Sequence, residues 1–175
     1  MLVEVIFIAK LELFLQDPLV SMASVISIFL LTSGVGSYLY KRVALRVGMV
    51  GFPLLVAGVV CFSVAVFNTV IPALMEAPMA ARLAIAFAVV APSGVLLGMF
   101  YPYAVSRLVA HDRERAVPIT YGISTLASVL GATYAMTFMI IWGFDRLLFQ
   151  AAALYLLLAL LVVLYGRLAK ENLLA

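Results

Sequence analysis

The chain is poor in the residues that build cross-links and metal sites. Its 175 residues include one cysteine, Cys61, and one histidine, His111. A single cysteine cannot form a disulfide within the chain, and a single histidine cannot supply a bis-histidine haem site or a histidine-rich zinc site. No CxxCH sequence for covalent haem attachment occurs. We therefore expect neither a metal nor a cofactor.

Charged residues are also scarce. They make up 11% of the sequence, whereas 67% of the residues are hydrophobic and the mean hydropathy is +1.24. Soluble domains carry about 25% charged residues, so this composition excludes a soluble domain and predicts a protein embedded in the lipid bilayer. The net charge of +3 does not indicate nucleic-acid binding, because the basic residues lie in short segments beside apolar runs, where they orient a membrane protein.

Long apolar runs predict an all-α bundle of about six transmembrane helices in a single domain. A helix needs about 20 apolar residues to span the hydrocarbon core. The predicted spans cover residues 2–16, 19–40, 47–71, 82–107, 117–142 and 147–165. A six-helix unit also has the size of one half of a major facilitator fold, in which two such halves enclose the substrate.

Basic residues are unequally divided between the two sides of this predicted bundle. With six spans, eight of them fall on the side of the chain termini, and only Arg82 and Arg146 fall on the other side. Cytoplasmic segments carry the excess of lysine and arginine in membrane proteins. We therefore expect both termini in the cytoplasm.

The first predicted span carries three charged residues, Glu4, Lys10 and Glu12. None of their spacings is the i,i+3 or i,i+4 separation that pairs charges on one helix, so their partners must lie elsewhere. A charge near the bilayer centre costs about 3 kcal/mol. Two interpretations remain open. Either the glutamates lie near the helix ends while Lys10 snorkels, or the charges form a buried face that meets a partner protein or a solute.

The fourth span contains helix-breaking residues at its centre. Pro92, Ser93 and Gly94 interrupt the apolar run from residue 86 to residue 107, and they predict a helix break near the bilayer midplane. Discontinuous helices often hold the substrate site of secondary transporters. The alternative interpretation is an ordinary proline kink that a neighbouring helix fills.

Small residues predict where helices approach one another closely, because they let two backbones come together. The candidate packing positions are Gly34, Gly36, Gly98, Ala127, Gly131 and Ala135. The last three repeat every four residues in the fifth span, so they lie along one face of that helix.

Three stretches carry a resemblance to a known family: MLVEVIFIAKLELFLQDPLVSMASVISIFLLTSGVGSYLYKR, GMFYPYAVSRL and YGISTLASVLGATYAMTFMIIWGF. Together they resemble the membrane region of the bacterial spermidine-synthase-like membrane proteins. The resemblance implies a helical membrane domain in a bacterial inner membrane, typically joined to a soluble Rossmann-like aminopropyltransferase domain. This sequence has no glycine-rich nucleotide loop after a strand, so the family's enzymatic activity does not carry over. We expect a truncated or split relative.

Three functions are compatible with these features. The favoured one is a non-catalytic accessory or structural subunit that packs against other membrane proteins, because the chain is small, its first helix is short and no acidic cluster marks a cation path. The second is a half-size transporter for a small solute such as a polyamine, which would work as a dimer of two copies. The third is the membrane anchor of a split aminopropyltransferase-like enzyme. No nucleophile is paired with a base, so we expect no catalysis by this chain alone.

Overall fold

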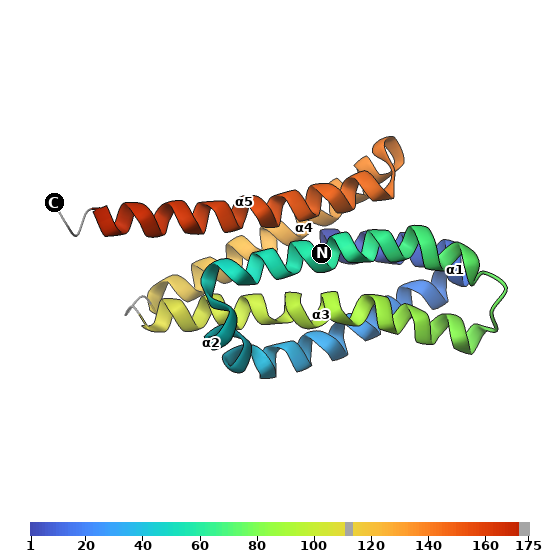
Figure 1. The fold of residues 1–175 in the computed structure, drawn as a ribbon, viewed down its shortest axis with the longest axis horizontal. Coiled ribbons are helices and arrows are strands. Elements are labelled where there is room, and N and C mark those ends of the chain that lie inside the picture. The colour runs from blue at the N-terminus through green and yellow to red at the C-terminus, as the bar shows by residue number, and fades with distance from the viewer. Residues whose placement is uncertain (111–113, 172–175) are drawn as a thin grey trace.

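The computed structural model describes residues 1–110 and 114–171, and these residues form helices joined by short turns, with no strand among them (Figure 1). The elements are α1 (Leu2–Leu15), α2 (Pro18–Ala73), α3 (Met79–Ala110), the short 3-10 helix η1 (Glu114–Ala116), α4 (Val117–Trp142) and α5 (Phe144–Glu171). The predicted all-α class is confirmed.

Five helical segments within the described residues are long and apolar enough to cross a membrane. They are Pro18–Val43, Val50–Ala73, Met79–Ala110, Val117–Trp142 and Phe144–Leu164. The chain is therefore a multi-pass integral membrane protein, as its composition predicts.

Helix α2 contains two of these spans, because it reverses direction at one end of the bundle (Figure 1). The reversal lies at Gly48, whose φ of 69° and ψ of 179° are readily adopted only by glycine. The other connection of α2, to α1, is equally tight. The Asp17 side chain caps α2 by accepting hydrogen bonds from the backbone N–H groups of Leu19 and Val20, and Pro18 suits the first helical turn.

Helix α1 is short and lies in the centre of the bundle, where it contacts α2, α3, α4 and α5. Ile6, Phe7, Leu11 and Phe14 are fully buried. Its 14 residues extend about 21 Å, less than the hydrocarbon core of about 30 Å, and the N-terminus lies about midway along the bundle (Figure 1). The described residues therefore form five spans and one helix that is too short to cross the hydrocarbon core. The prediction that the N-terminus is cytoplasmic assumed six complete crossings, so this location stays a prediction.

Two glycines allow α2 and α3 to pack with their backbones in contact. A Cβ atom added at Gly36 would overlap the carbonyl oxygen of Val95, and one added at Gly98 would overlap the backbone of Ser33. Such close approach is the reason small residues are favoured between membrane helices. Gly34 is different, because it is exposed and a Cβ atom there would meet no atom within 4 Å.

The helix break predicted at the centre of the fourth span does not occur in α3. It runs as one uninterrupted α-helix through Pro92, Ser93 and Gly94. Proline removes one intrahelical hydrogen bond, but the helix is supported from the side, because Gly94 packs directly on Thr32 of α2. Ser93 is buried, and its hydroxyl has no hydrogen-bond partner among the described residues.

Candidate functional site

Three polar side chains from three helices form one cluster, which we call the Lys10 cluster. The Nζ atom of Lys10 in α1 lies 2.5 Å from Oδ1 of Asp145 in α5, and it donates a hydrogen bond of 3.3 Å to Oδ1 of Asn68 in α2. Nδ2 of Asn68 donates a hydrogen bond of 3.1 Å to Oδ2 of Asp145. Each member therefore contacts the other two, and the cluster ties together helices far apart in sequence.

Within the Lys10 cluster, the lysine side chain is more enclosed than the aspartate side chain. The ammonium of Lys10 lies 5.6 Å from the ring centroid of Phe67 and 5.9 Å from that of Phe144, within the range of cation–π attraction. The Lys10 side chain is 14% exposed and that of Asp145 is 42% exposed. Oδ1 of Asp145 is nevertheless buried, and the Lys10 ammonium is its only hydrogen-bonding or ionic partner among the described residues. Removing Lys10 would leave that oxygen without a partner.

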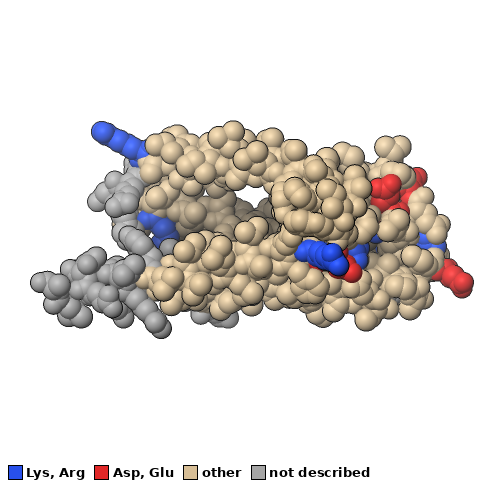
Figure 2. Space-filling model, turned by 90° about the horizontal axis from the view of Figure 1, so that it is seen from above, with Lys and Arg blue, Asp and Glu red and all other residues tan. Residues whose placement is uncertain are grey.

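The cluster lies near one end of the bundle and not at its centre. Asp145 is the second residue of α5, and Asn68 lies five residues before the end of α2, which is about 8 Å along a helix. In Figure 2 the acidic side chains gather toward one end, and much of the visible surface carries neither sign of charge. The free-energy cost of placing a charge in the membrane is smaller near the surface than at the midplane.

The two glutamates of α1 do not join the cluster. Glu12 is exposed and Glu4 is partly buried, and neither side chain makes a hydrogen bond or ion pair with any described residue. The three charged residues of α1 therefore do not form one polar face. Lys10 finds an ion-pair partner within the same chain.

Arg82 is a structural residue that the sequence interpretation counted only as a loop charge. It lies in the first turn of α3, and its guanidinium donates hydrogen bonds to the carbonyl oxygens of Phe14, Met75 and Ala77. It also lies 6.0 Å from the ring centroid of Phe14. Carbonyl groups at a helix C-terminus lack intrahelical partners and attract cations, so Arg82 fixes the end of α1 to the connection between α2 and α3.

Replacing Arg82 with methionine should therefore lower the free energy of unfolding by about 2 kcal/mol, because the freed carbonyls lose charge-assisted hydrogen bonds. Thermal unfolding in detergent, followed by circular dichroism, measures the loss. Arg42→Met is the matched control, since Arg42 is exposed and the substitution removes the same charge. Equal melting temperatures for the two variants would contradict the structural role of Arg82.

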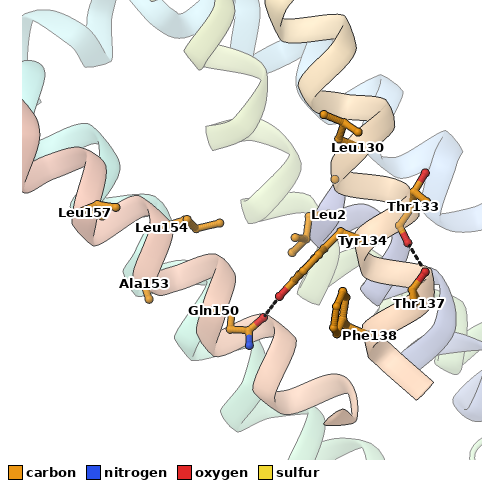
Figure 3. Close-up of a pocket in the computed structure, with 11 residues that line it drawn as sticks. Leu2, Leu130, Thr133, Tyr134, Thr137, Phe138, Gln150, Ala153, Leu154 and Leu157 are labelled. Carbon is orange, nitrogen blue, oxygen red and sulfur yellow. Dashed lines mark hydrogen bonds between the residues drawn. The ribbon is translucent and has the colours of Figure 1, made fainter. Parts of the chain in front are cut away.

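A second candidate site is a cleft of about 850 Å³ between α4 and α5, which we call the α4–α5 cleft (Figure 3). It is lined by Leu2, Leu130, Gly131, Thr133, Tyr134, Thr137, Phe138, Gln150, Ala153, Leu154 and Leu157. Its two threonine hydroxyls donate to carbonyl oxygens of their own helix. Tyr134 instead donates a hydrogen bond of 3.0 Å across the cleft to Oε1 of Gln150. Of this lining, the sequence interpretation placed only Gly131 among the candidate site residues, as a packing position.

The fold and these two sites define a helical multi-pass membrane protein with an ion pair between α1 and α5 and a mainly apolar lateral cleft. No family model, curated protein or solved structure matches the chain. The resemblance to the spermidine-synthase-like membrane proteins therefore stays a prediction.

Proposed function

We propose that this chain is a non-catalytic accessory or structural subunit that packs against another membrane protein through α4. The observation that carries the proposal is the exposure of this helix. In an apolar stretch of 18 residues within α4, only 6% of the residues are buried. In the corresponding stretches of the other four spans, 28–44% of the residues are buried. Helix α4 packs mainly against α1 and α5, so most of its circumference is uncovered.

The residue types on α4 support protein contact over contact with lipid alone. Association of membrane helices depends on small residues at the interface, since lipid tails are as apolar as leucine. The line of small residues is only partly covered within the chain. Ala135 is buried and Gly131 lies beside Leu2 of α1, but Ala127 is exposed because α1 does not extend that far. A helix of another protein would cover the rest of the line.

The orientation that fits this proposal follows from the charges, and the bacterial origin rests on the resemblance to a bacterial family. One end of the bundle carries the basic residues Lys41, Arg42, Arg107 and Arg115, and we place this end in the cytoplasm of a bacterium. The Lys10 cluster then lies near the opposite surface of the inner membrane. The likeness to half of a major facilitator fold belongs to the alternative of a half-size transporter for a solute such as a polyamine, which requires a second copy of the chain.

Site-specific photo-crosslinking in the native membrane tests the proposal. A photoreactive phenylalanine analogue at Ala127 should give one discrete adduct with a different polypeptide. The matched control is the same analogue at Phe62 of α2, which is 65% exposed and should give only lipid adducts. An adduct between two copies of the chain would favour the transporter alternative. Lipid adducts alone at Ala127 would contradict the subunit role.

A further inference from the structure

The α4–α5 cleft combines an apolar channel with one polar end, which is the pattern of a site for an amphiphilic ligand. Leucines from three helices line the deeper part, and the Tyr134–Gln150 pair spans the part nearer the connection between α4 and α5 (Figure 3). Because α4 and α5 are both membrane spans, the cleft opens sideways toward lipid. Whatever fills it must therefore come from the hydrocarbon phase.

The polar end offers a hydrogen-bond donor. Gln150 uses Oε1 to accept the bond from Tyr134, whereas its Nε2 group makes no hydrogen bond to any residue in the described part of the chain. An unsatisfied amide N–H in hydrocarbon is unfavourable by several kcal/mol. The cleft thus favours a ligand with a hydrogen-bond acceptor, such as a carbonyl oxygen.

The depth of Gln150 separates two kinds of carbonyl ligand. Gln150 lies six residues after the start of α5, about 9 Å along the helix, and Trp142 and Phe144 mark the interface at that start. The ester carbonyls of phospholipids belong to the interfacial layer outside the hydrocarbon core. A carbonyl that reaches Gln150 must belong to a group that itself dissolves in hydrocarbon.

Aromatic side chains flank this position. The rings of Tyr134 and Phe138 lie 4.4 Å apart between centroids, and those of Phe138 and Trp142 lie 4.8 Å apart. These residues follow one another at four-residue spacing, so they form a ladder along α4 from the cleft to the membrane surface. A flat ring could stack against such a ladder, since aromatic pairs favour offset contacts at these distances.

We propose that the α4–α5 cleft binds a lipid-soluble quinone. One quinone carbonyl accepts a hydrogen bond from Nε2 of Gln150, the ring lies against Phe138, and the isoprenoid tail follows Leu130, Leu154 and Leu157 toward the bilayer midplane. The volume of about 850 Å³ falls within the range of sites that hold small organic ligands. Ala127 is not among the residues that line the cleft, so the inference does not rest on the proposed subunit role.

The single tryptophan of the chain allows a direct binding test. Trp142 is the only tryptophan and stands at the end of the aromatic ladder, so its fluorescence reports a quenching quinone nearby. The purified chain in phosphatidylcholine nanodiscs is titrated with a short-chain ubiquinone analogue. We expect saturable quenching with one site per chain. Quenching that rises linearly with the quinone content of the bilayer would overturn the proposal.

Three variants make the test specific. Gln150→Leu should weaken quinone binding about tenfold, in line with the loss of one hydrogen bond in a dry site. Ala153→Phe, which fills the cleft and leaves the polar pair intact, should abolish saturable quenching. Thr125→Val is the control, because Thr125 lies on α4 outside the cleft lining and should bind as the native chain does. Equal affinity of all three variants would overturn the proposal.

A parallel measurement with brominated phospholipid distinguishes quinone binding from the binding of ordinary acyl chains. Phosphatidylcholine with brominated chains quenches tryptophan by contact and carries its carbonyls at the interface. We expect it to quench Trp142 weakly and to the same extent in the native chain and in Gln150→Leu. Saturable quenching by the brominated lipid that Ala153→Phe abolishes would show that the cleft holds a phospholipid chain, and it would overturn the proposal.

Discussion

Replacing Gly36 with valine should lower the free energy of unfolding by about 3 kcal/mol and prevent the chain from accumulating as a monodisperse protein. The new Cβ atom would overlap the carbonyl oxygen of Val95 in α3. Backbone atoms cannot rotate away as a flexible side chain can, so α2 and α3 would have to separate along their contact. These two helices share the most extensive contact in the bundle, and the damage would therefore reach the core.

Gly34→Val is the matched control, because Gly34 lies on the same helix only two residues away. It is exposed, and a Cβ atom there meets no atom within 4 Å, so we expect a change within about 0.5 kcal/mol. Thermal unfolding in detergent, with size-exclusion chromatography of the heated samples, measures both variants. Similar melting temperatures for Gly34→Val and Gly36→Val would show that α2 and α3 are not in backbone contact.

This pair also shows how far the sequence could predict the fold. Composition and run length predict the membrane class and the helical structure, because lipid leaves few other ways to satisfy the backbone. The small residues around Gly34 and Gly36 indicate close helix packing somewhere on α2. They do not specify which glycine faces α3, since that depends on the rotation of α2 against a helix distant in sequence.

Where the chain reverses and where a helix continues also depend on packing against helices distant in sequence. Pro92 was expected to break a helix, yet α3 continues through it with support from α2. The non-helical backbone lies at Gly48 instead, which is the second residue of the predicted span 47–71 and follows the basic connection of residues 41–46. A basic connection followed by a glycine was thus the stronger signal of reversal, whereas one proline inside a long apolar run only removes one hydrogen bond.

The candidate site was predicted only in part. Spacing within α1 correctly excluded a partner for Lys10 on its own helix. The partner, Asp145, stands at the start of the last span, and Asn68 stands near the end of another span. The sequence interpretation named neither residue as a candidate for the site. Residues at span ends pair with one another when the connections of several helices meet at one membrane surface, and no local pattern reveals which ends meet.

Replacing Asp145 with asparagine should lower the free energy of unfolding by about 2 kcal/mol, since it leaves the enclosed Lys10 ammonium without its counter-charge. Breaking a fully buried ion pair costs about 3–5 kcal/mol, whereas exposed pairs contribute about 1 kcal/mol or less. The exposed fractions of 14% for Lys10 and 42% for Asp145 place this pair between the two cases. Lys10→Met should have a similar effect, because it leaves Oδ1 of Asp145 buried and alone.

The double variant Lys10→Met with Asp145→Asn separates pairing from general damage. If the two charges stabilise each other, the double variant should be more stable than the sum of the single losses predicts, by about 1 kcal/mol or more. Thermal unfolding in detergent measures all three variants. Glu12→Gln is the control for removing a charge from α1, since Glu12 is exposed and its loss should leave the melting temperature unchanged. Strict additivity of the two losses would show that Lys10 and Asp145 act independently, and the cluster would then be held by Asn68 and the flanking aromatic rings alone.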